Sequence, residues 1–266
     1  MVSELIVVPY VLGREGVGMG AGPLALEAGA IEVLQPERVA RIALSEPFTN
    51  ETGACFDLNR QVAHAVAAAR ERDALPVILT GNCHTQQAVV AGLGVEELAL
   101  VWLDCHADFH TPETTESGFF DGTALSMTVG DCWTGLCGTV AGFEPMPAER
   151  VVLAGVRDVE PLERRRLDTS DVIEFGPSET GRVGAMLPLA ERTSLHIDLD
   201  VLDPAFGQAN QYAVAPGISP SDLLDVVRAV VTRSKLAAVT LSAYDPAFDR
   251  SAGVREAALA ALRLIA

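Results

Sequence analysis

Two short segments of the sequence carry metal-binding types of side chain at alternate positions. The first is Leu103-Asp104-Cys105-His106-Ala107-Asp108, which follows an apolar run at 98–102. Strand side chains repeat every two residues, so Asp104, His106 and Asp108 would share one face if the chain stayed extended there. The second segment is Leu195-His196-Ile197-Asp198-Leu199-Asp200, and its two aspartates have the same spacing.

This density of acids at the ends of apolar runs has a chemical consequence. Buried carboxylates that converge lose their hydration and repel one another, so they need cations to fold together. Carboxylate and imidazole groups are ligands for divalent metal ions. The two segments therefore predict a metal site, most simply one for two ions. A purely structural role for so many acids is much the weaker interpretation.

Apolar runs and helical spacings alternate along the chain. We expect strands at 5–8, 76–79, 98–102, 151–156, 172–175, 194–199 and 236–241, with helices at 56–72, 85–93 and 254–265 and another beginning at Ser219-Pro220. This alternation predicts a single α/β domain over residues 1–266, a three-layer α/β/α arrangement around a mostly parallel sheet. Ligands in such folds bind outside the carboxyl ends of the strands, where the acidic segments fall.

The composition narrows the class of partner and the compartment. The formal charge of −17 over 266 residues argues against nucleic acid and against an anionic membrane surface. No apolar stretch is long enough to span a bilayer, and the first nine residues lack the features of a signal peptide. The five cysteines show no zinc-type pairing and fit reduced thiols. We expect a cytoplasmic protein with a small-molecule substrate.

The motifs resemble those of the arginase/agmatinase family of ureohydrolases, over nearly the whole chain. The resemblance rests on Asp-x-His-x-Asp at 104–108, Thr111-Pro112 with its Thr/Ser loop, Asp-x-Asp-x-x-Asp-Pro at 198–204, the turn at Gly81 and the late Asp245-Pro246. It implies an arginase-like fold. It also implies that a hydroxide bridging two Mn²⁺ ions attacks a guanidino carbon and releases urea from an amine.

By position, the resemblance implies the roles of individual residues. Asp104 and Asp198 would bridge the two ions, and Asp108 would also aim the hydroxide by accepting a hydrogen bond from it. The implied metal ligands are Cys83, Asp104, His106, Asp108, Asp198 and Asp200. The implied contacts to the amino-acid end of a substrate are His110, Thr115, Ser117 and Glu160.

One ligand position departs from the family. The family has a histidine there, and counting without a gap from Leu79 puts Cys83 at this position. A slip of one residue would put His84 there instead. We favour Cys83, because the flanking strand and helix then keep their register. A thiolate is a softer ligand, so other divalent ions such as zinc or iron compete with manganese as the cofactor.

Two further departures concern catalysis and substrate. The family's proton-transfer histidine is replaced by Asp121, in Ser-Gly-Phe-Phe-Asp-Gly at 117–122. The family's acid that pairs with the guanidinium is replaced by Ala243. An arginine guanidinium stays cationic, and its burial without a partner would cost several kcal/mol. An N-hydroxylated guanidino group is less basic and could enter neutral.

The sequence therefore favours an amidinohydrolase that converts Nω-hydroxy-L-arginine to ornithine and hydroxyurea, as in arginase-like proteins of antibiotic biosynthesis. Asp108, Asp121 or solvent would supply the proton to the leaving amine. Three alternatives stay open: an arginase or agmatinase for an unmodified guanidino substrate, a metal-binding pseudoenzyme, and a one-zinc amide hydrolase. Family members form trimers or hexamers, but the short end of this chain is also compatible with a monomer, so the oligomeric state is open.

Overall fold

The structure, a computed structural model, describes residues 2–266. In that part of the chain the main sheet has eight strands, and all of its strand pairs are parallel. These strands are β1 (Ser3–Val8), β4 (Arg38–Arg41), β5 (Leu75–Thr80), β6 (Leu98–Leu103), β7 (Val151–Ala154), β8 (Ile173–Phe175), β9 (Arg192–Asp198) and β10 (Lys235–Ser242). A short hairpin, β2 (Tyr10–Val11) and β3 (Arg14–Glu15), lies apart from the sheet.

Helices cover both faces of the sheet. They are α1 (Gly22–Leu34), α2 (Glu51–Glu71), α3 (Thr85–Leu93), α4 (Ala124–Thr128), α5 (Thr134–Cys137), α6 (Pro161–Leu167), α7 (Pro220–Arg233) and α8 (Gly253–Arg263). Two 3₁₀ turns also carry acids: η2 (Phe120–Thr123) contains Asp121, and η5 (Leu199–Val201) contains Asp200.

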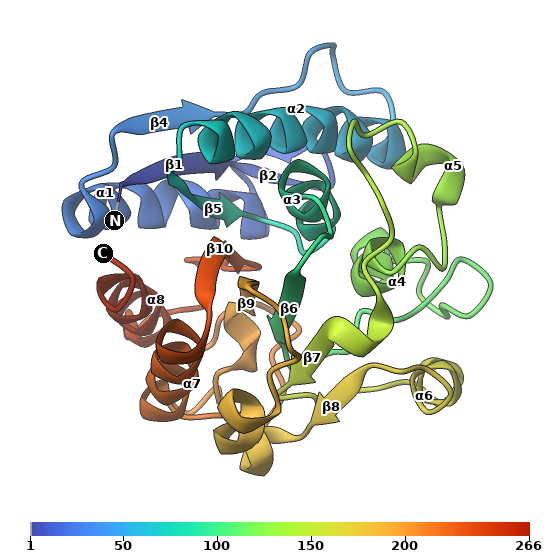
Figure 1. The fold of residues 1–266 in the computed structure, drawn as a ribbon, viewed down its shortest axis with the longest axis vertical. Helices are drawn as coiled ribbons and strands as arrows, with labels where there is room; N and C mark the ends of the chain where they lie inside the picture. Colours follow the sequence, from blue (N-terminus) through green and yellow to red (C-terminus); the bar gives the residue numbers. More distant parts are fainter. Residues whose placement is uncertain (1) are drawn as a thin grey trace.

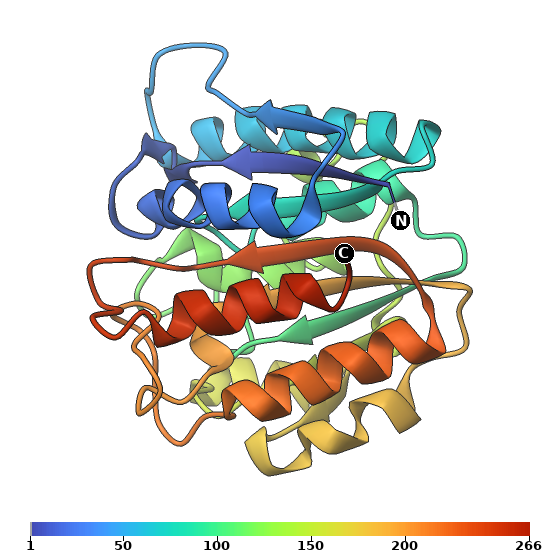
Figure 2. The ribbon, with the colours of Figure 1, turned by 90° about the vertical axis from the view of Figure 1, so that its left-hand side faces the viewer.

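The layers follow from which apolar residues each helix buries. Helices α1, α7 and α8 share one hydrophobic core with one face of the sheet, and α2, α3 and α4 share a second core with the opposite face. Figure 1 shows the two helical layers on either side of the strands, and Figure 2 shows α1, α8 and α7 in front of the sheet. The predicted three-layer α/β/α fold class is confirmed.

The strand order brings distant segments of the chain together. It runs β4-β1-β5-β10-β9-β6-β7-β8, so β5, β10, β9 and β6 are consecutive neighbours in the middle of the sheet. Because these strands are parallel, their carboxyl ends lie at one edge. Both acidic segments and the turn that carries Cys83 therefore meet at that edge.

Local sequence explains several of these elements. All six residues of β6 are buried, as an apolar strand between two helical layers requires. Helix α7 begins after Ser219, which accepts a hydrogen bond from Asp222 N and forms a capping box with that residue. The predicted helix at 85–93 coincides with α3. No helix among residues 2–266 is long and apolar enough to cross a membrane.

The structure also contains elements that the sequence analysis did not predict. Strand β4 is largely exposed at the edge of the sheet, so its Arg-Val-Ala-Arg sequence lacks the apolar run of a buried strand. Helix α2 begins at Glu51, earlier than predicted, because Asn50 caps it by accepting a hydrogen bond from Gly53 N. Neither difference moves the edge where the acids meet.

Candidate metal centre

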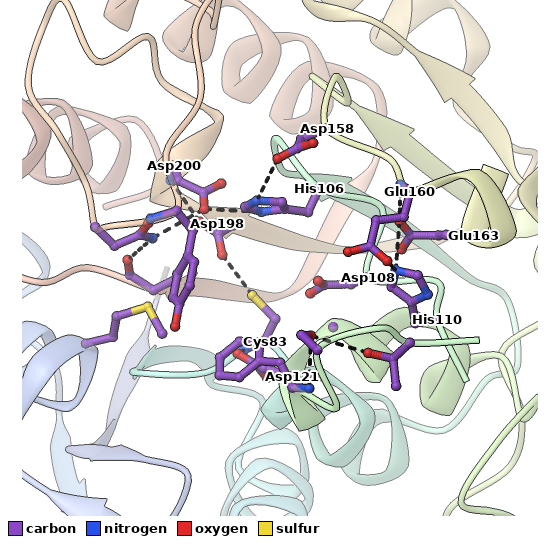
Figure 3. Close-up of a pocket in the computed structure, with 18 of the residues that line it drawn as sticks. Cys83, His106, Asp108, His110, Asp121, Asp158, Glu160, Glu163, Asp198 and Asp200 are labelled. Atoms are coloured by element: carbon purple, nitrogen blue, oxygen red, sulfur yellow. Dashed lines mark hydrogen bonds and ion pairs between the residues drawn. The ribbon is translucent and has the colours of Figure 1, made fainter. Parts of the chain in front are cut away.

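A cavity of about 590 Å³ opens at the carboxyl edge of the sheet. Figure 3 shows acidic side chains from several strands and loops pointing into it. Most of the residues predicted from the sequence line it: Cys83, His106, Asp108, His110, Thr115, Ser117, Asp121, Glu160, Asp198 and Asp200. Asp104 is fully buried beside this set and is not part of the cavity wall. The structure thus brings the predicted residues together.

Asp104 is held from both sides at the end of β6. Its Oδ2 accepts a hydrogen bond from Trp102 Nε1 at 2.9 Å, and its Oδ1 accepts one from His106 N at 2.7 Å. Burial, and then the nearby Asp200, raise the pKa of Asp104 to about 6. The carboxylate is therefore fixed in place and would be stabilised by a nearby cation.

His106 lies between two acids. Its Nδ1 is 3.4 Å from Asp104 Oδ1 and 3.4 Å from Asp200 Oδ2. Burial alone would lower the pKa of His106, but Asp200 and Asp104 raise it overall. Burial alone would raise the pKa of Asp200, but His106 lowers it overall. The imidazole thus offers a nitrogen donor beside the oxygens of both carboxylates.

Cys83 and Asp198 meet on the other side of the centre. The Cys83 thiol donates to Asp198 Oδ2 at 3.0 Å, and Asp198 Oδ1 accepts from Asp200 N at 2.8 Å. Burial raises the pKa of Asp198, and neighbouring Asp200 and Asp104 add to the rise. Burial, followed by Asp198, also raises the pKa of the Cys83 thiol well above its usual value. Removing the thiol proton would therefore require a cation beside the sulfur.

The turn after β5 separates Cys83 from His84. A Cβ on Gly81 would lie 2.3 Å from the carbonyl oxygen of Tyr10, so only glycine fits at the close approach that starts this turn. Beyond it, the sulfur of Cys83 faces the cavity. The His84 ring packs 5.4 Å from the Phe120 ring, and its Nδ1 lies 3.3 Å from Asn59 Oδ1. His84 is buried away from the cavity.

Asp108 reaches the centre by a different backbone path from the one the alternating pattern suggested. Its φ is +49°, in the left-handed region, so the segment does not stay extended. Its carbonyl oxygen accepts from Leu125 N at 2.9 Å and from Ser126 N at 3.2 Å, which fixes this conformation. Burial, and then Asp104 and Asp121, raise the pKa of Asp108 well above its usual value. A carboxyl with a raised pKa keeps its proton to higher pH than an ordinary aspartate does.

Asp121 lines the cavity, but its carboxylate is already engaged. Oδ2 accepts from Asn82 Nδ2 at 2.6 Å and from Cys83 N at 3.0 Å, and Oδ1 accepts from His84 N at 2.8 Å. These donors belong to the turn that carries Cys83. The contacts favour a positioning role for Asp121 over the proton transfer that the sequence suggested.

The predicted substrate-binding residues all line the cavity, and Figure 3 shows His110 and Glu160 on the side away from Cys83 and Asp198. His110 Nε2 is 3.3 Å from Glu160 Oε2 and 3.5 Å from Glu163 Oε2. Thr115 Oγ1 and Ser117 Oγ lie 3.4 Å apart in the loop before η2. The cavity lining thus includes both carboxylates and hydroxyl groups, which suit an amino group and a carboxylate respectively.

Some residues of the centre were not predicted from the sequence. The sulfur of Cys105 lies 3.3 Å from His106 Nδ1, although a side chain between two strand ligands is expected to face away from them. Asn210 Nδ2 donates to Asp200 Oδ2 at 3.3 Å and to the carbonyl of Ala243 at 2.8 Å. Ser242 Oγ lies 3.2 Å from the sulfur of Cys83. Each contact depends on strand neighbours that no local pattern reveals.

The donor chemistry of the site fits divalent metal ions. Asp104, Asp108, Asp198 and Asp200 are between 0 and 9 % exposed. Among the described residues that line the cavity there is no lysine or arginine to neutralise them. Asp104, Cys105, His106 and Asp200 present ligand atoms within 4.8 Å of one another, as do Cys83, Asp104 and His196. Oxygen, imidazole and thiolate donors at this spacing can hold such ions.

Comparison with known proteins agrees with this chemistry. The model of the arginase family matches residues 5–266. The chain is 30% identical over 230 residues to an arginase of Bacillus caldovelox, covering 76% of this chain and 77% of that protein. It is also 30% identical over 172 residues to an N(omega)-hydroxy-L-arginine amidinohydrolase of Streptomyces lavendulae, covering 64% of this chain and 60% of that protein.

The solved structures extend the likeness to the fold. The structure of the Bacillus caldovelox arginase matches 99% of this chain and 97% of its own, with a TM-score of 0.89 at 22% identity. With its α/β fold, its acidic centre and a family match over almost its whole length, the chain belongs to the arginase family of ureohydrolases, binuclear metallohydrolases that act on linear amidines.

Proposed function

We propose that this protein hydrolyses the guanidino C–N bond of an arginine-like amino acid, with Nω-hydroxy-L-arginine as its preferred substrate. The observation that carries the proposal is the convergence of four buried aspartates, Asp104, Asp108, Asp198 and Asp200, with a thiol and an imidazole. Among the described residues that line the cavity, no lysine or arginine neutralises these acids. The products would be ornithine and hydroxyurea.

Cys83, Asp104, His106, Asp108, Asp198 and Asp200 would hold two divalent ions, which we take to be Mn²⁺. When bound, such ions would lower the pKa of a water so that hydroxide forms near neutral pH. The contacts of Asp104 with Trp102 and His106 N keep its oxygens in fixed directions. Donors preorganised in this way lose little entropy on binding and hold ligands in a defined geometry.

Asp108 is our candidate for the proton carrier. It lines the cavity, and burial among acids raises its pKa, so it can accept a proton from the attacking water and return it to the departing amine. Asp121 would act through the turn instead, because three donors already occupy its oxygens. It would hold Cys83 where the sulfur faces Asp198.

The choice of a hydroxylated substrate rests on the wall near Ala243. Ala243 is 3 % exposed and lines the cavity, and the resemblance assigns it the position of the family's guanidinium-pairing acid. The next side chain, Tyr244, turns away, and its hydroxyl donates to Asp249 Oδ2 at 3.1 Å. Neighbouring Asn210 is a neutral amide that is already bonded to Asp200 and to Ala243 O. A neutral guanidino group suits such a wall better than a cation.

The other end of the cavity would receive the amino acid. Glu160 would pair with the α-amino group, and His110, Thr115 and Ser117 would contact the α-carboxylate. All four residues line the same cavity as Asp108 and Asp198.

A second candidate is an arginase or agmatinase that acts on an unmodified guanidino group. The family match and the Bacillus caldovelox relative favour it, since that relative is named an arginase and matches more of the chain than the amidinohydrolase does. The Glu51, Asp158 and Glu163 carboxylates on the cavity wall could offset part of a cation's charge.

A substrate panel separates the two candidates. Purified protein, loaded with Mn²⁺, is assayed with Nω-hydroxy-L-arginine, L-arginine and agmatine, and kcat/KM is compared. We expect the hydroxylated substrate to exceed arginine at least tenfold, a difference of about 1.4 kcal/mol in transition-state stabilisation. Faster turnover of arginine or agmatine would refute the substrate assignment and leave the ureohydrolase assignment standing. No turnover with bound metal would indicate a pseudoenzyme.

A further inference from the structure

A line of polar side chains continues from Cys83 into the interior of the protein. The sulfur of Cys83 lies 3.2 Å from Ser242 Oγ, and Ser242 Oγ lies 3.3 Å from His196 Nε2. Ser242 is the last residue of β10, and His196 is on the neighbouring strand β9. The three side chains are between 0 and 2 % exposed. The proposed catalytic chemistry does not account for Ser242 or His196.

The surroundings of the His196 ring determine which of its nitrogens donates a hydrogen bond. Its ring lies against Trp102, with ring centroids 4.0 Å apart, so the imidazole is held from one side. Among the described residues its Nδ1 has no hydrogen-bond partner. The ring is fully buried, and its Nε2 faces a hydroxyl instead of an acid, so it is neutral and carries one N–H. A buried N–H left unpaired is rarer and more costly than an unpaired acceptor, so the proton belongs on Nε2.

The remaining hydrogen bonds then follow. His196 Nε2 donates to Ser242 Oγ, which leaves the Ser242 hydroxyl proton free to donate to the sulfur of Cys83. The alternative acceptor, the carbonyl oxygen of Ile197, is farther away, at 3.4 Å. The Cys83 thiol in turn donates to Asp198 Oδ2 at 3.0 Å. Each group therefore donates a hydrogen bond to the next, from His196 through Ser242 and Cys83 to Asp198.

We infer that Ser242 and His196 are positioning residues for Cys83, which hold a hydrogen-bond donor on its sulfur and so tune which divalent metal it binds. This inference rests on the proposed role of Cys83 as a metal ligand. A hydrogen bond to an ionised sulfur is charge-assisted and strengthens when the thiol loses its proton. Such a bond withdraws electron density from the sulfur and makes it a harder ligand. It therefore moves the preference of the site towards Mn²⁺ and away from softer ions.

The test uses Co²⁺ as a probe, because a cobalt–thiolate bond gives a sulfur-to-metal charge-transfer band in the near ultraviolet. The full-length protein is compared with Ser242→Ala, and Cys83→Ser serves to assign the band. We expect the band in the wild type, its loss in Cys83→Ser, and a shift to longer wavelength in Ser242→Ala. We also expect the ratio of the Mn²⁺ to the Co²⁺ dissociation constant to rise about tenfold in Ser242→Ala.

Ser194→Ala is the matched control. Ser194 is also buried and lies on β9, but its hydroxyl accepts from Gln86 Nε2 at 2.9 Å, away from Cys83. This variant should keep the wild-type band and metal ratio. His196→Phe is the second variant: it keeps an aromatic ring against Trp102 and removes the Nε2 donor. It should shift the band in the same direction as Ser242→Ala. If Ser242→Ala does not fold, His196→Phe is compared with the wild type in its place.

The outcomes separate this inference from the proposed function. A wild-type cobalt protein without the band would show that Cys83 is not a ligand, and would overturn the inference together with that part of the proposal. A wild-type band that neither Ser242→Ala nor His196→Phe shifts, with an unchanged metal ratio, would overturn the inference alone. A shift of equal size in Ser194→Ala would also overturn it, since it would trace the effect to packing.

Discussion

The sulfur of Cys83 lies 3.0 Å from Asp198 Oδ2, although 115 positions separate the two residues in the sequence. Cys83 lies in the turn after β5 and Asp198 ends β9, and β10 lies between these strands, so the contact spans the carboxyl ends of three neighbouring strands. Both groups are buried, and burial raises the pKa of each. A pair that shares one proton in this way is suited to exchange it for a metal ion.

Replacement of Cys83 tests its role as a ligand. Cys83→Ala removes the thiol, so we expect the bound metal to fall by about one ion per chain and turnover to fall at least 10- to 100-fold. Elemental analysis and steady-state kinetics measure the two effects. Cys55→Ala is the matched control, because Cys55 is equally buried but lies in α2. Unchanged metal content in Cys83→Ala would contradict the assignment.

The substitution Asp121→Asn distinguishes a positioning role for this residue from a role in proton transfer. In Asp121→Asn a neutral amide replaces the charged carboxylate that accepts hydrogen bonds from Cys83 N and His84 N. Because a hydrogen bond to a charged group contributes about 1.5–3 kcal/mol, we expect the free energy of unfolding to fall by about 2 kcal/mol, and metal binding to weaken. Urea unfolding and metal titration measure these changes.

The pH–rate profile of Asp121→Asn is the decisive readout for this residue. A positioning role predicts a lower rate with both limbs of the profile retained. Loss of one limb would assign proton transfer to Asp121. Asp168→Asn, a change of an exposed acid at the end of α6, is the control for stability.

Ala243 tests the substrate preference. Ala243→Glu would restore an acid beside the guanidino end of the cavity, and an acid there pairs with a cation. We expect kcat/KM for L-arginine to rise relative to Nω-hydroxy-L-arginine by a factor of ten or more. Ala243→Gln has the same size without the charge and should not change the ratio. If Glu and Gln have the same effect, the missing countercharge does not set the preference.

Stability of the metal-free protein should depend on pH in a defined sense. The pKa of Asp104 is raised from 3.8 to about 6, and those of Asp108 and Asp198 are raised well above 3.8. Above pH 3.8 the folded state therefore holds more protons than the unfolded state. It follows that these groups make the free energy of unfolding fall as pH rises from about 4 through 6 and beyond.

Metal ions should offset that loss, because they replace the protons. We expect the rise in Tm on adding Mn²⁺ to protein treated with a chelator to be larger at pH 8 than at pH 5. Differential scanning calorimetry at the two pH values measures it. An equal rise at both would show that the buried acids do not bind the ion.

Much of the site could be predicted from the sequence because its residues follow apolar strands. Asp104 directly follows β6, Asp198 is the last residue of β9, and Cys83 lies in the turn after β5, and parallel strands end at one edge of the sheet. What could not be predicted depends on tertiary contacts. The left-handed backbone at Asp108 is fixed by Leu125 N and Ser126 N.

Other roles were hidden for the same reason. The sequence suggested proton transfer for Asp121, but its hydrogen-bond partners come from the turn after β5, 37–39 residues earlier. Ser242 has no local signal, and only the pairing of β10 with β5 and β9 brings it to Cys83 and His196. The sequence therefore indicated which strand-end residues meet at this edge, but not the hydrogen bonds between distant segments.

The metal content of the purified protein tests the central claim most directly, measured for the wild type and Asp198→Asn alongside turnover of Nω-hydroxy-L-arginine. The account predicts about two divalent ions per chain in the wild type, and loss of most metal and turnover in Asp198→Asn. Asp225→Asn, a change of an exposed acid on α7, should match the wild type. A wild-type protein without transition metal, or an Asp198→Asn variant that keeps both metal and activity, would contradict it.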